Sequence, residues 1–247
     1  MNTSEFLNIT SLIVPDRTAV IFDGRRITYS DLALRVVKLA NALRQLGVEK
    51  GDRIATMEVN CNEHIEAYFA AAKLDAIYVP INFRASQSEL EYMLNDSSPT
   101  VLLAGSRYTD MIELISSKVE SLKALIVIDG IVEGWHTYER IVDSAPDDEM
   151  YPESDEDDLT MLMFTAGTTG SPKGVMLSHD SFSSYILSNV SPPDMEVEEK
   201  NILTVPLYHI AGVQAVMAAV YGGRTLIIQR QFEPVEWMTL VEQEKAN

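Results

Sequence analysis

The chain has 247 residues, of which 46% are hydrophobic and 23% are charged, and its formal net charge is −18. This length and composition are ordinary for a globular protein with a sizeable core, and length alone allows one large or two modest domains. The acidic balance argues against sequence-independent nucleic-acid binding, which needs Lys and Arg to neutralise phosphates, so we expect no nucleic-acid partner.

Cysteine content and hydropathy narrow the class of protein further. Cys61 is the single cysteine, so neither an intrachain disulfide nor a cysteine-based zinc site can form. Residues 1–5 contain neither the basic segment nor the apolar segment of a signal peptide. No apolar stretch of the sequence reaches the length needed to cross a membrane. We therefore expect a cytoplasmic protein without a transmembrane segment.

The first part of the chain opens with a hairpin pattern and then alternates between strand and helix patterns. Residues 19–22, the Asp23-Gly24 turn and residues 27–29 predict a β-hairpin. Ser30 is expected to cap a helix that runs to about Leu46 and ends at the following glycine. Further strands are predicted at 53–59, 76–79, 100–104 and 124–128, and further helices at 63–74, 88–94 and 108–117.

An acidic stretch with two prolines, residues 145–158, is expected to be a solvated connector. It divides the chain into a first α/β subdomain, residues 1–150, and a partial second one, residues 151–247. After the connector, strands are predicted at 159–164, 201–205 and 224–228, and helices at 180–188, 213–221 and 234–244. The alternation predicts an α/β fold with two layered sheets of βαβ type and flanking helices.

A run rich in glycine and hydroxyl residues follows the strand predicted at 159–164. Glycines let backbone N–H groups approach phosphate oxygens, and successive N–H groups form an anion-binding concavity. Thr and Ser hydroxyls add hydrogen bonds, and one lysine adds positive charge. We predict that the second subdomain carries a phosphate-binding loop, made of Thr165, Ala166, Gly167, Thr168, Thr169, Gly170, Ser171, Pro172, Lys173 and Gly174.

Two other interpretations of this loop are weaker. A Walker A loop ends in Gly-Lys-Ser/Thr, whereas here Pro172 precedes the lysine and Gly174 follows it, which disfavours a P-loop NTPase. Clusters of Gly, Thr, Ser and Pro are commonly simple turns. The length and order of the run favour phosphate binding over a simple turn.

The loop resembles the signature of the adenylate-forming superfamily, which includes acyl-CoA synthetases, peptide-synthetase adenylation domains and luciferases. Residues 206–212, Pro-Leu-Tyr-His-Ile-Ala-Gly, resemble the family's next motif. Residues 76–82 and 46–55 are similar to segments that precede the loop in these enzymes, so the resemblance covers nearly the whole chain in order. Ala166 stands where Ser is commoner, and Asp75 stands where the family usually has Gly.

The resemblance implies a reaction and its cofactors. A carboxylic acid, fatty or aromatic, attacks the α-phosphorus of Mg-ATP to give an acyl-adenylate and pyrophosphate, and coenzyme A then displaces AMP. By the same resemblance the loop holds the β- and γ-phosphates, and Lys173 offsets their charge. Thr165 helps to hold Mg²⁺, together with a Glu that these 247 residues do not contain.

His209 is the candidate catalytic residue. From the sequence alone, a histidine that hydrogen-bonds at a strand-to-helix turn is the better interpretation. The resemblance places this position at the junction of the acid pocket and the nucleotide, where an imidazole could orient the carboxylate. The remaining histidines, His64, His136 and His179, are expected to be structural or at the surface, because no pair has metal-ligand spacing.

Later motifs of the family are absent from these residues, so the sequence is interpreted as the incomplete N-terminal domain of a longer acyl-CoA synthetase, and the isolated chain is expected to be inactive. One alternative is a non-catalytic nucleotide- or partner-binding module of the same fold. Another is a peptide-synthetase-type adenylation domain. The missing C-terminal half is the expected partner, and the apolar face of the last helix, with Trp237, makes a homo-oligomer a further candidate.

Overall fold

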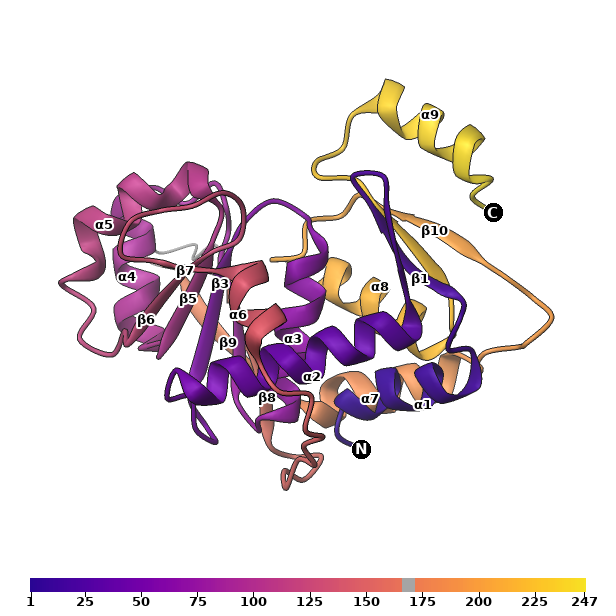
Figure 1. Ribbon diagram of the computed structural model, residues 1–247, viewed down its shortest axis with the longest axis horizontal. Coiled ribbons are helices and arrows are strands. Elements are labelled where there is room, and N and C mark those ends of the chain that lie inside the picture. Colours follow the sequence, from indigo (N-terminus) through magenta and orange to yellow (C-terminus); the bar gives the residue numbers. More distant parts are fainter. Residues whose placement is uncertain (166–171) are drawn as a thin grey trace.

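The computed structural model describes residues 1–165 and 172–247 and shows two sheets flanked by helices (Figure 1). Within these residues, a seven-stranded sheet has the order β7 (His136–Thr137), β6 (Ala124–Val127), β5 (Val101–Ala104), β3 (Arg53–Met57), β4 (Ile77–Pro80), β8 (Leu159–Thr165) and β9 (Lys173–Ser178). A four-stranded sheet has the order β10 (Lys200–Leu203), β11 (Thr225–Ile228), β1 (Thr18–Phe22) and β2 (Arg25–Thr28). The α/β class with two sheets is therefore confirmed.

Helices cover both sheets (Figure 1). They are α1 (Ser4–Ile13), α2 (Tyr29–Gln45), α3 (Asn62–Lys73), α4 (Gln87–Ser97), α5 (Thr109–Ser116), α6 (Tyr138–Ser144), α7 (His179–Asn189), α8 (Ile210–Tyr221) and α9 (Pro234–Glu244), with a 3-10 turn at Ser106–Tyr108. All strand pairs are parallel except the hairpins β1–β2 and β8–β9. The carboxyl ends of neighbouring parallel strands therefore meet at one edge of each sheet.

Each sheet takes strands from both sides of the boundary expected after residue 150. The four-stranded sheet pairs β1 with β11, and the seven-stranded sheet pairs β4 with β8. Neither 1–150 nor 151–247 thus holds a complete sheet, although the connector is largely exposed as expected. Asp75 fixes the connector, because its carboxylate accepts hydrogen bonds from the backbone N–H groups of Glu153 (2.7 Å) and Ser154 (3.1 Å).

Most predicted elements are present, with shifted ends. The first long helix begins at Tyr29, and its cap is Thr28, whose Oγ1 accepts a hydrogen bond from the Asp31 N–H at 3.1 Å; the prediction of Ser30 as cap was wrong. Asp75, where the family usually has Gly, has a φ of 53°, a left-handed conformation that glycine adopts without strain. Four elements were not predicted from the sequence: α1, α6, β7 and β9.

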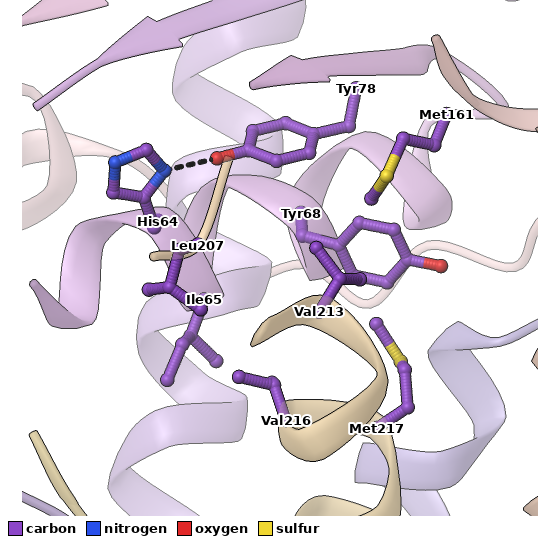
Figure 2. A pocket seen from close by; sticks show the side chains of 9 residues that line it. All are labelled: His64, Ile65, Tyr68, Tyr78, Met161, Leu207, Val213, Val216 and Met217. Atoms are coloured by element: carbon purple, nitrogen blue, oxygen red, sulfur yellow. Dashed lines mark hydrogen bonds between the residues drawn. The ribbon is translucent and has the colours of Figure 1, made fainter. Parts of the chain in front are cut away.

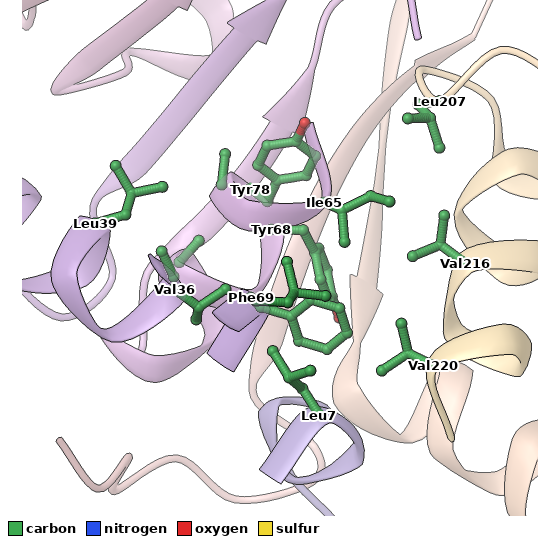
Figure 3. Packing of buried hydrophobic residues seen from close by; sticks show 14 of the residues in the cluster. Leu7, Val36, Leu39, Ile65, Tyr68, Phe69, Tyr78, Leu207, Val216 and Val220 are labelled. Atoms are coloured by element: carbon green, nitrogen blue, oxygen red, sulfur yellow. The ribbon is translucent and has the colours of Figure 1, made fainter. Parts of the chain in front are cut away.

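The main core lies where α1, α3 and α8 meet (Figure 3). On α3, the rings of Tyr68 and Phe69 are 5.3 Å apart and nearly perpendicular. Leu7 of α1 and Val216 and Val220 of α8 surround them, and all of these side chains are buried. Because α3 follows a strand of the larger sheet and α8 follows a strand of the smaller one, this core fixes the two sheets relative to each other.

Helix α9 lies at the outer end of the molecule and buries none of its residues (Figure 1). Val235, Trp237 and Met238 of α9 are exposed, Trp237 by 39%, so the apolar residues expected on this helix are at the surface. Arg26 and Glu244 form an ion pair that holds the end of α9 to β2. Oligomerisation through this face stays a prediction.

Glu63 on α3 is a buried carboxyl group whose pKa is raised from 4.5 to about 7, first by burial and then by the neighbouring carboxylate of Glu66. Its Oε2 has no hydrogen-bond partner among the described residues. The folded protein therefore keeps this proton at pH values where the unfolded chain has lost it. Stability from this group is complete below about pH 4.5 and is lost as the pH rises to about 7.

We expect Glu63→Gln to increase the free energy of unfolding at pH 8 by up to about 3 kcal/mol, since one pKa unit corresponds to about 1.4 kcal/mol, and to change it little near pH 4. Urea denaturation at both pH values measures this. Glu113→Gln, at an exposed position on α5, is the control and should be neutral at both. A Glu63→Gln protein that is no more stable than the wild type at pH 8 would rule out the protonated buried carboxyl.

Candidate functional site

The predicted phosphate loop connects two antiparallel strands rather than a strand and a helix. Thr165 ends β8 and lies opposite Lys173, which begins β9. The Thr165 Oγ1 donates a hydrogen bond to the Lys173 carbonyl oxygen at 3.4 Å, and both side chains are exposed. Ser178, the last residue of β9, then caps α7.

Only part of the predicted loop belongs to the described residues. Thr165, Pro172, Lys173 and Gly174 are placed. An added Cβ at Gly174 would lie 2.9 Å from the Leu162 Cδ1, so a glycine here avoids a clash across the hairpin. Outside the described residues lie Ala166, Gly167, Thr168, Thr169, Gly170 and Ser171.

His209 lies at the turn between β10 and α8. Its Nδ1 accepts a hydrogen bond from the Ala211 N–H at 3.3 Å, so it caps the helix, and its side chain is exposed. A neutral ring in this arrangement carries its proton on Nε2, which can donate to a carboxylate. The turn is tight, because a Cβ at Gly212 would lie 2.4 Å from the Pro206 carbonyl oxygen.

The turn that carries His209 meets the turn that follows β4. The rings of Tyr208 and Phe83 are 5.5 Å apart with an interplanar angle of 75°, and the Arg84 guanidinium lies 5.2 Å from the Phe83 ring centre. Strand β4 pairs in parallel with β8, which leads into the predicted phosphate loop. Three segments that are distant in the sequence therefore gather at carboxyl ends of strands, where open α/β sheets bind ligands.

A small apolar cavity lies beside the His209 turn (Figure 2). Its volume of about 20 Å³ is close to that of one water-sized sphere. Leu207 and Val213 connect it to the turn and to α8. The lining residues come from α3, β4, β8, α8 and the turn, and they are His64, Ile65, Tyr68, Tyr78, Met161, Leu207, Val213, Val216 and Met217.

The polar groups in this lining are all hydrogen-bonded, the Tyr68 hydroxyl to the hydroxyls of Thr3 and Thr160. The Nδ1 of His64 lies 2.6 Å from the Tyr78 hydroxyl (Figure 2), and its Nε2 lies 3.0 Å from the Glu58 carbonyl oxygen. Burial lowers the pKa of His64 to about 4, so the ring is neutral at physiological pH. The cavity thus presents an apolar surface.

The other histidines and the cysteine have structural or surface positions. His179 is buried, and its Nδ1 accepts a hydrogen bond from the Thr3 N–H at 3.1 Å, which ties the start of α1 to α7. His136 is exposed on β7. Cys61 is buried, and burial raises the pKa of its thiol.

The described part of the chain contains no group of three or more His, Cys, Asp or Glu side chains placed to hold a metal ion. It also contains no helix with both the length and the hydropathy to cross a bilayer.

Phe83 and Arg84 were not predicted as site residues from the sequence, and no contact was predicted for Tyr208. The available signal was their position after predicted strands, at the edge where parallel strands end. Which of these turns would meet depends on how the two sheets pack.

The fold and this edge define an α/β protein with a candidate ligand site at the ends of parallel strands. The family of AMP-binding enzymes matches residues 13–247, and the chain belongs to this family. The resemblance to adenylate-forming enzymes is therefore confirmed.

Two curated relatives and one solved structure illustrate the similarity. A feruloyl-CoA synthase of an Amycolatopsis species is 32% identical over 233 residues, which are 94% of this chain and 45% of that protein. The long-chain-fatty-acid–CoA ligase FadD13 of Mycobacterium tuberculosis is 32% identical over 224 residues, 90% of this chain and 43% of that protein. The inhibitor-bound crystal structure of the N-terminal domain of FACL13 from Mycobacterium tuberculosis matches with a TM-score of 0.90 and 30% identity, over 99% of this chain and 61% of that one. The chain thus spans less than half the length of these two curated relatives.

Proposed function

We propose that this chain is the nucleotide- and acid-holding part of an acid–CoA ligase. The complete enzyme would join a carboxylic acid to AMP, release pyrophosphate, and then transfer the acyl group to coenzyme A. One observation carries the proposal: the hairpin with Lys173 and the turn with His209 both lie at ends of strands, next to the β4 turn. Membership of the AMP-binding family and two relatives named as CoA ligases support it.

Acid activation brings two anions together, so the protein must position them and neutralise charge. We assign the β- and γ-phosphates to the segment from Thr165 to Gly174, whose backbone N–H groups and hydroxyls would bind them. Negative charge grows on pyrophosphate as its bond to the α-phosphorus breaks. A lysine cation beside it, from Lys173, then lowers the energy of the transition state more than that of the bound ATP.

Mg²⁺ is the proposed metal, and Thr165 is its proposed ligand in this chain. Mg²⁺ takes oxygen ligands, and an exposed hydroxyl such as Thr165 Oγ1 fits one of them. Bound Mg²⁺ would offset the negative charge of the phosphate oxygens. The described residues contain no acidic cluster to complete the ligand set.

His209 is assigned to the acid. The proton on its Nε2 can hydrogen-bond a carboxylate and hold it against the α-phosphorus. The apolar cavity beside the turn favours a fatty or aromatic acid, whose hydrocarbon part would displace the side chains of α8, since about 20 Å³ holds no acyl chain. Coenzyme A is proposed as the thiol because one relative is a feruloyl-CoA synthase and the other a long-chain-fatty-acid–CoA ligase. The cytoplasmic location and the two subdomains stay predictions.

The test is a screen of the complete protein for acyl-CoA formation with short, medium, long-chain and aromatic acids. We expect product with at least one fatty or aromatic acid. Nucleotide binding without product would favour the non-catalytic module. Acyl-adenylate that is transferred only to a carrier-protein thiol would favour a peptide-synthetase-type adenylation domain.

The 247-residue chain alone should show little or no acid-dependent exchange of pyrophosphate into ATP, because it spans less than half of its curated relatives. Radiolabelled pyrophosphate measures this directly, with the complete protein as positive control. Robust exchange by the isolated chain would show that all groups needed for adenylation lie within these residues.

A further inference from the structure

Asn60 is a buried side chain whose hydrogen bonds join the two sheets. It lies just after β3, at the carboxyl end of the seven-stranded sheet, and is 2% exposed. Its Oδ1 accepts from the Leu207 N–H at 2.9 Å, and its Nδ2 donates to the Val205 carbonyl oxygen at 3.1 Å. The same Nδ2 lies 3.2 Å from the Gln229 carbonyl oxygen. One side chain thus contacts the backbone after β10 and after β11.

The backbone of Asn60 adds a further bond to the same region. Its N–H donates to the Arg230 carbonyl oxygen at 3.1 Å. Both parallel strands β10 and β11 of the smaller sheet are therefore fixed, at their carboxyl ends, to the end of β3. The backbone groups of Val205 and Leu207 lie beyond the end of β10 at Leu203. Without the amide of Asn60 the buried Leu207 N–H would lose its acceptor.

The turn that Asn60 holds is closed by its own backbone contacts. The His209 N–H donates to the Pro206 carbonyl oxygen at 3.0 Å, and Gly212 packs against that same oxygen so closely that a Cβ would lie 2.4 Å from it. A shift of Pro206 would therefore carry His209 and the start of α8 with it. Asn60 binds the residues on each side of Pro206, so it sets the place of the whole turn.

We infer that Asn60 is a positioning residue for acid activation: it fixes His209 relative to the ends of β4 and β8 without touching the reactants. The role of Asn60 in placing the His209 turn rests on contacts within the chain. Its consequence for catalysis rests on the proposed function, so the experiment has one arm for each.

Asn41 offers a matched control. It is also a fully buried asparagine with three hydrogen bonds, donated to the carbonyl oxygens of Val37 (3.1 Å) and Asp148 (2.9 Å) and accepted from Arg44 (2.8 Å). None of these partners belongs to the His209 turn. Asn60→Ala and Asn41→Ala therefore remove similar bonds at different places.

The first arm measures amide hydrogen exchange of residues 205–213 in the 247-residue chain. Asn60→Ala should speed exchange of this segment by about tenfold or more, since lost buried hydrogen bonds lower the local opening energy, while Asn41→Ala leaves it unchanged. Unchanged exchange in Asn60→Ala, or an equal increase in Asn41→Ala, would overturn the inference.

Asn60→Asp keeps the test informative if the alanine variant does not fold. Its carboxylate retains the acceptor for the Leu207 N–H but loses the donors to two carbonyl oxygens. Protonation restores one donor, so protection of 205–213, corrected for intrinsic exchange, should be higher at pH 5 than at pH 8. Protection that is equal to wild type at both values would contradict the inference.

The second arm uses the complete protein and acid-dependent pyrophosphate exchange. Asn60→Ala should lower kcat by about tenfold or more while the KM for ATP changes less than about twofold, because a displaced His209 affects the reacting geometry more than nucleotide binding. An equal fall in kcat for Asn41→Ala would contradict a positioning role. If the wild type shows no exchange with any acid, the proposed function fails while the first arm still decides the position of the turn.

Discussion

Lys173→Ala should lower acid-dependent pyrophosphate exchange by the complete protein about 100-fold or more, with an unchanged melting temperature. Loss of one preorganised group that stabilises transition-state charge typically costs about 10²–10³ in rate. Lys173 is exposed at the start of β9, and its pairing with Thr165 uses backbone atoms that alanine keeps. The substitution therefore removes a charge and little packing.

Two further variants separate charge from fold at this position. Lys173→Arg keeps the charge with a different shape and should retain more activity than Lys173→Ala. Lys118→Ala removes an exposed lysine that follows α5 and pairs with Glu91 of α4, and should leave exchange unchanged. Parallel losses of melting temperature and activity in Lys173→Ala would point to a structural role.

Arg35→Met should destabilise the chain by about 3–5 kcal/mol at pH 7.5, a melting-temperature drop on the order of 10 °C. The Arg35 guanidinium binds Glu66 at 3.0 Å and Glu139 at 2.9 and 3.0 Å, and so links α2, α3 and α6. Glu66 is fully buried, and the Tyr138 hydroxyl also donates to it. Removing the guanidinium leaves a buried carboxylate without its cation.

Thermal unfolding of single and double variants tests this account. Arg26→Met removes an exposed ion pair with Glu244 and should cost less than about 1 kcal/mol. Glu66→Gln combined with Arg35→Met should recover part of the loss, because it removes the buried charge. If Arg35→Met costs no more than Arg26→Met, the buried network does not stabilise the fold as described.

Local patterns predicted much of the α/β alternation, and the missing elements have physical reasons. Helix α1 is rich in Ser, Thr and Asn, which are poor helix formers, and it is stabilised by Leu7 in the core and by the bond from Thr3 to His179. Strand β9 is an exposed edge strand without alternation of buried and exposed residues. These elements depend on tertiary contacts that no short window of sequence contains.

The candidate site also combines features that consecutive residues suggest with features that depend on tertiary packing. The loop from Thr165 to Gly174 was proposed from the sequence because its chemistry lies in consecutive residues, and its role in phosphate binding stays a prediction. The contact between Phe83 and Tyr208 and the bonds of Asn60 arise only when the two sheets pack. The acidic connector suggested a boundary after residue 150, but strand pairing across it decides the composition of both sheets.

Exchange of radiolabelled pyrophosphate into ATP by the complete protein tests the central claim most directly, because it reports adenylate formation without coenzyme A. We predict label in ATP only when a fatty or aromatic acid is present, and its loss in Lys173→Ala. Nucleotide binding with no exchange for any acid, or exchange that needs no acid, would contradict an acid-activating site built on this hairpin and the His209 turn.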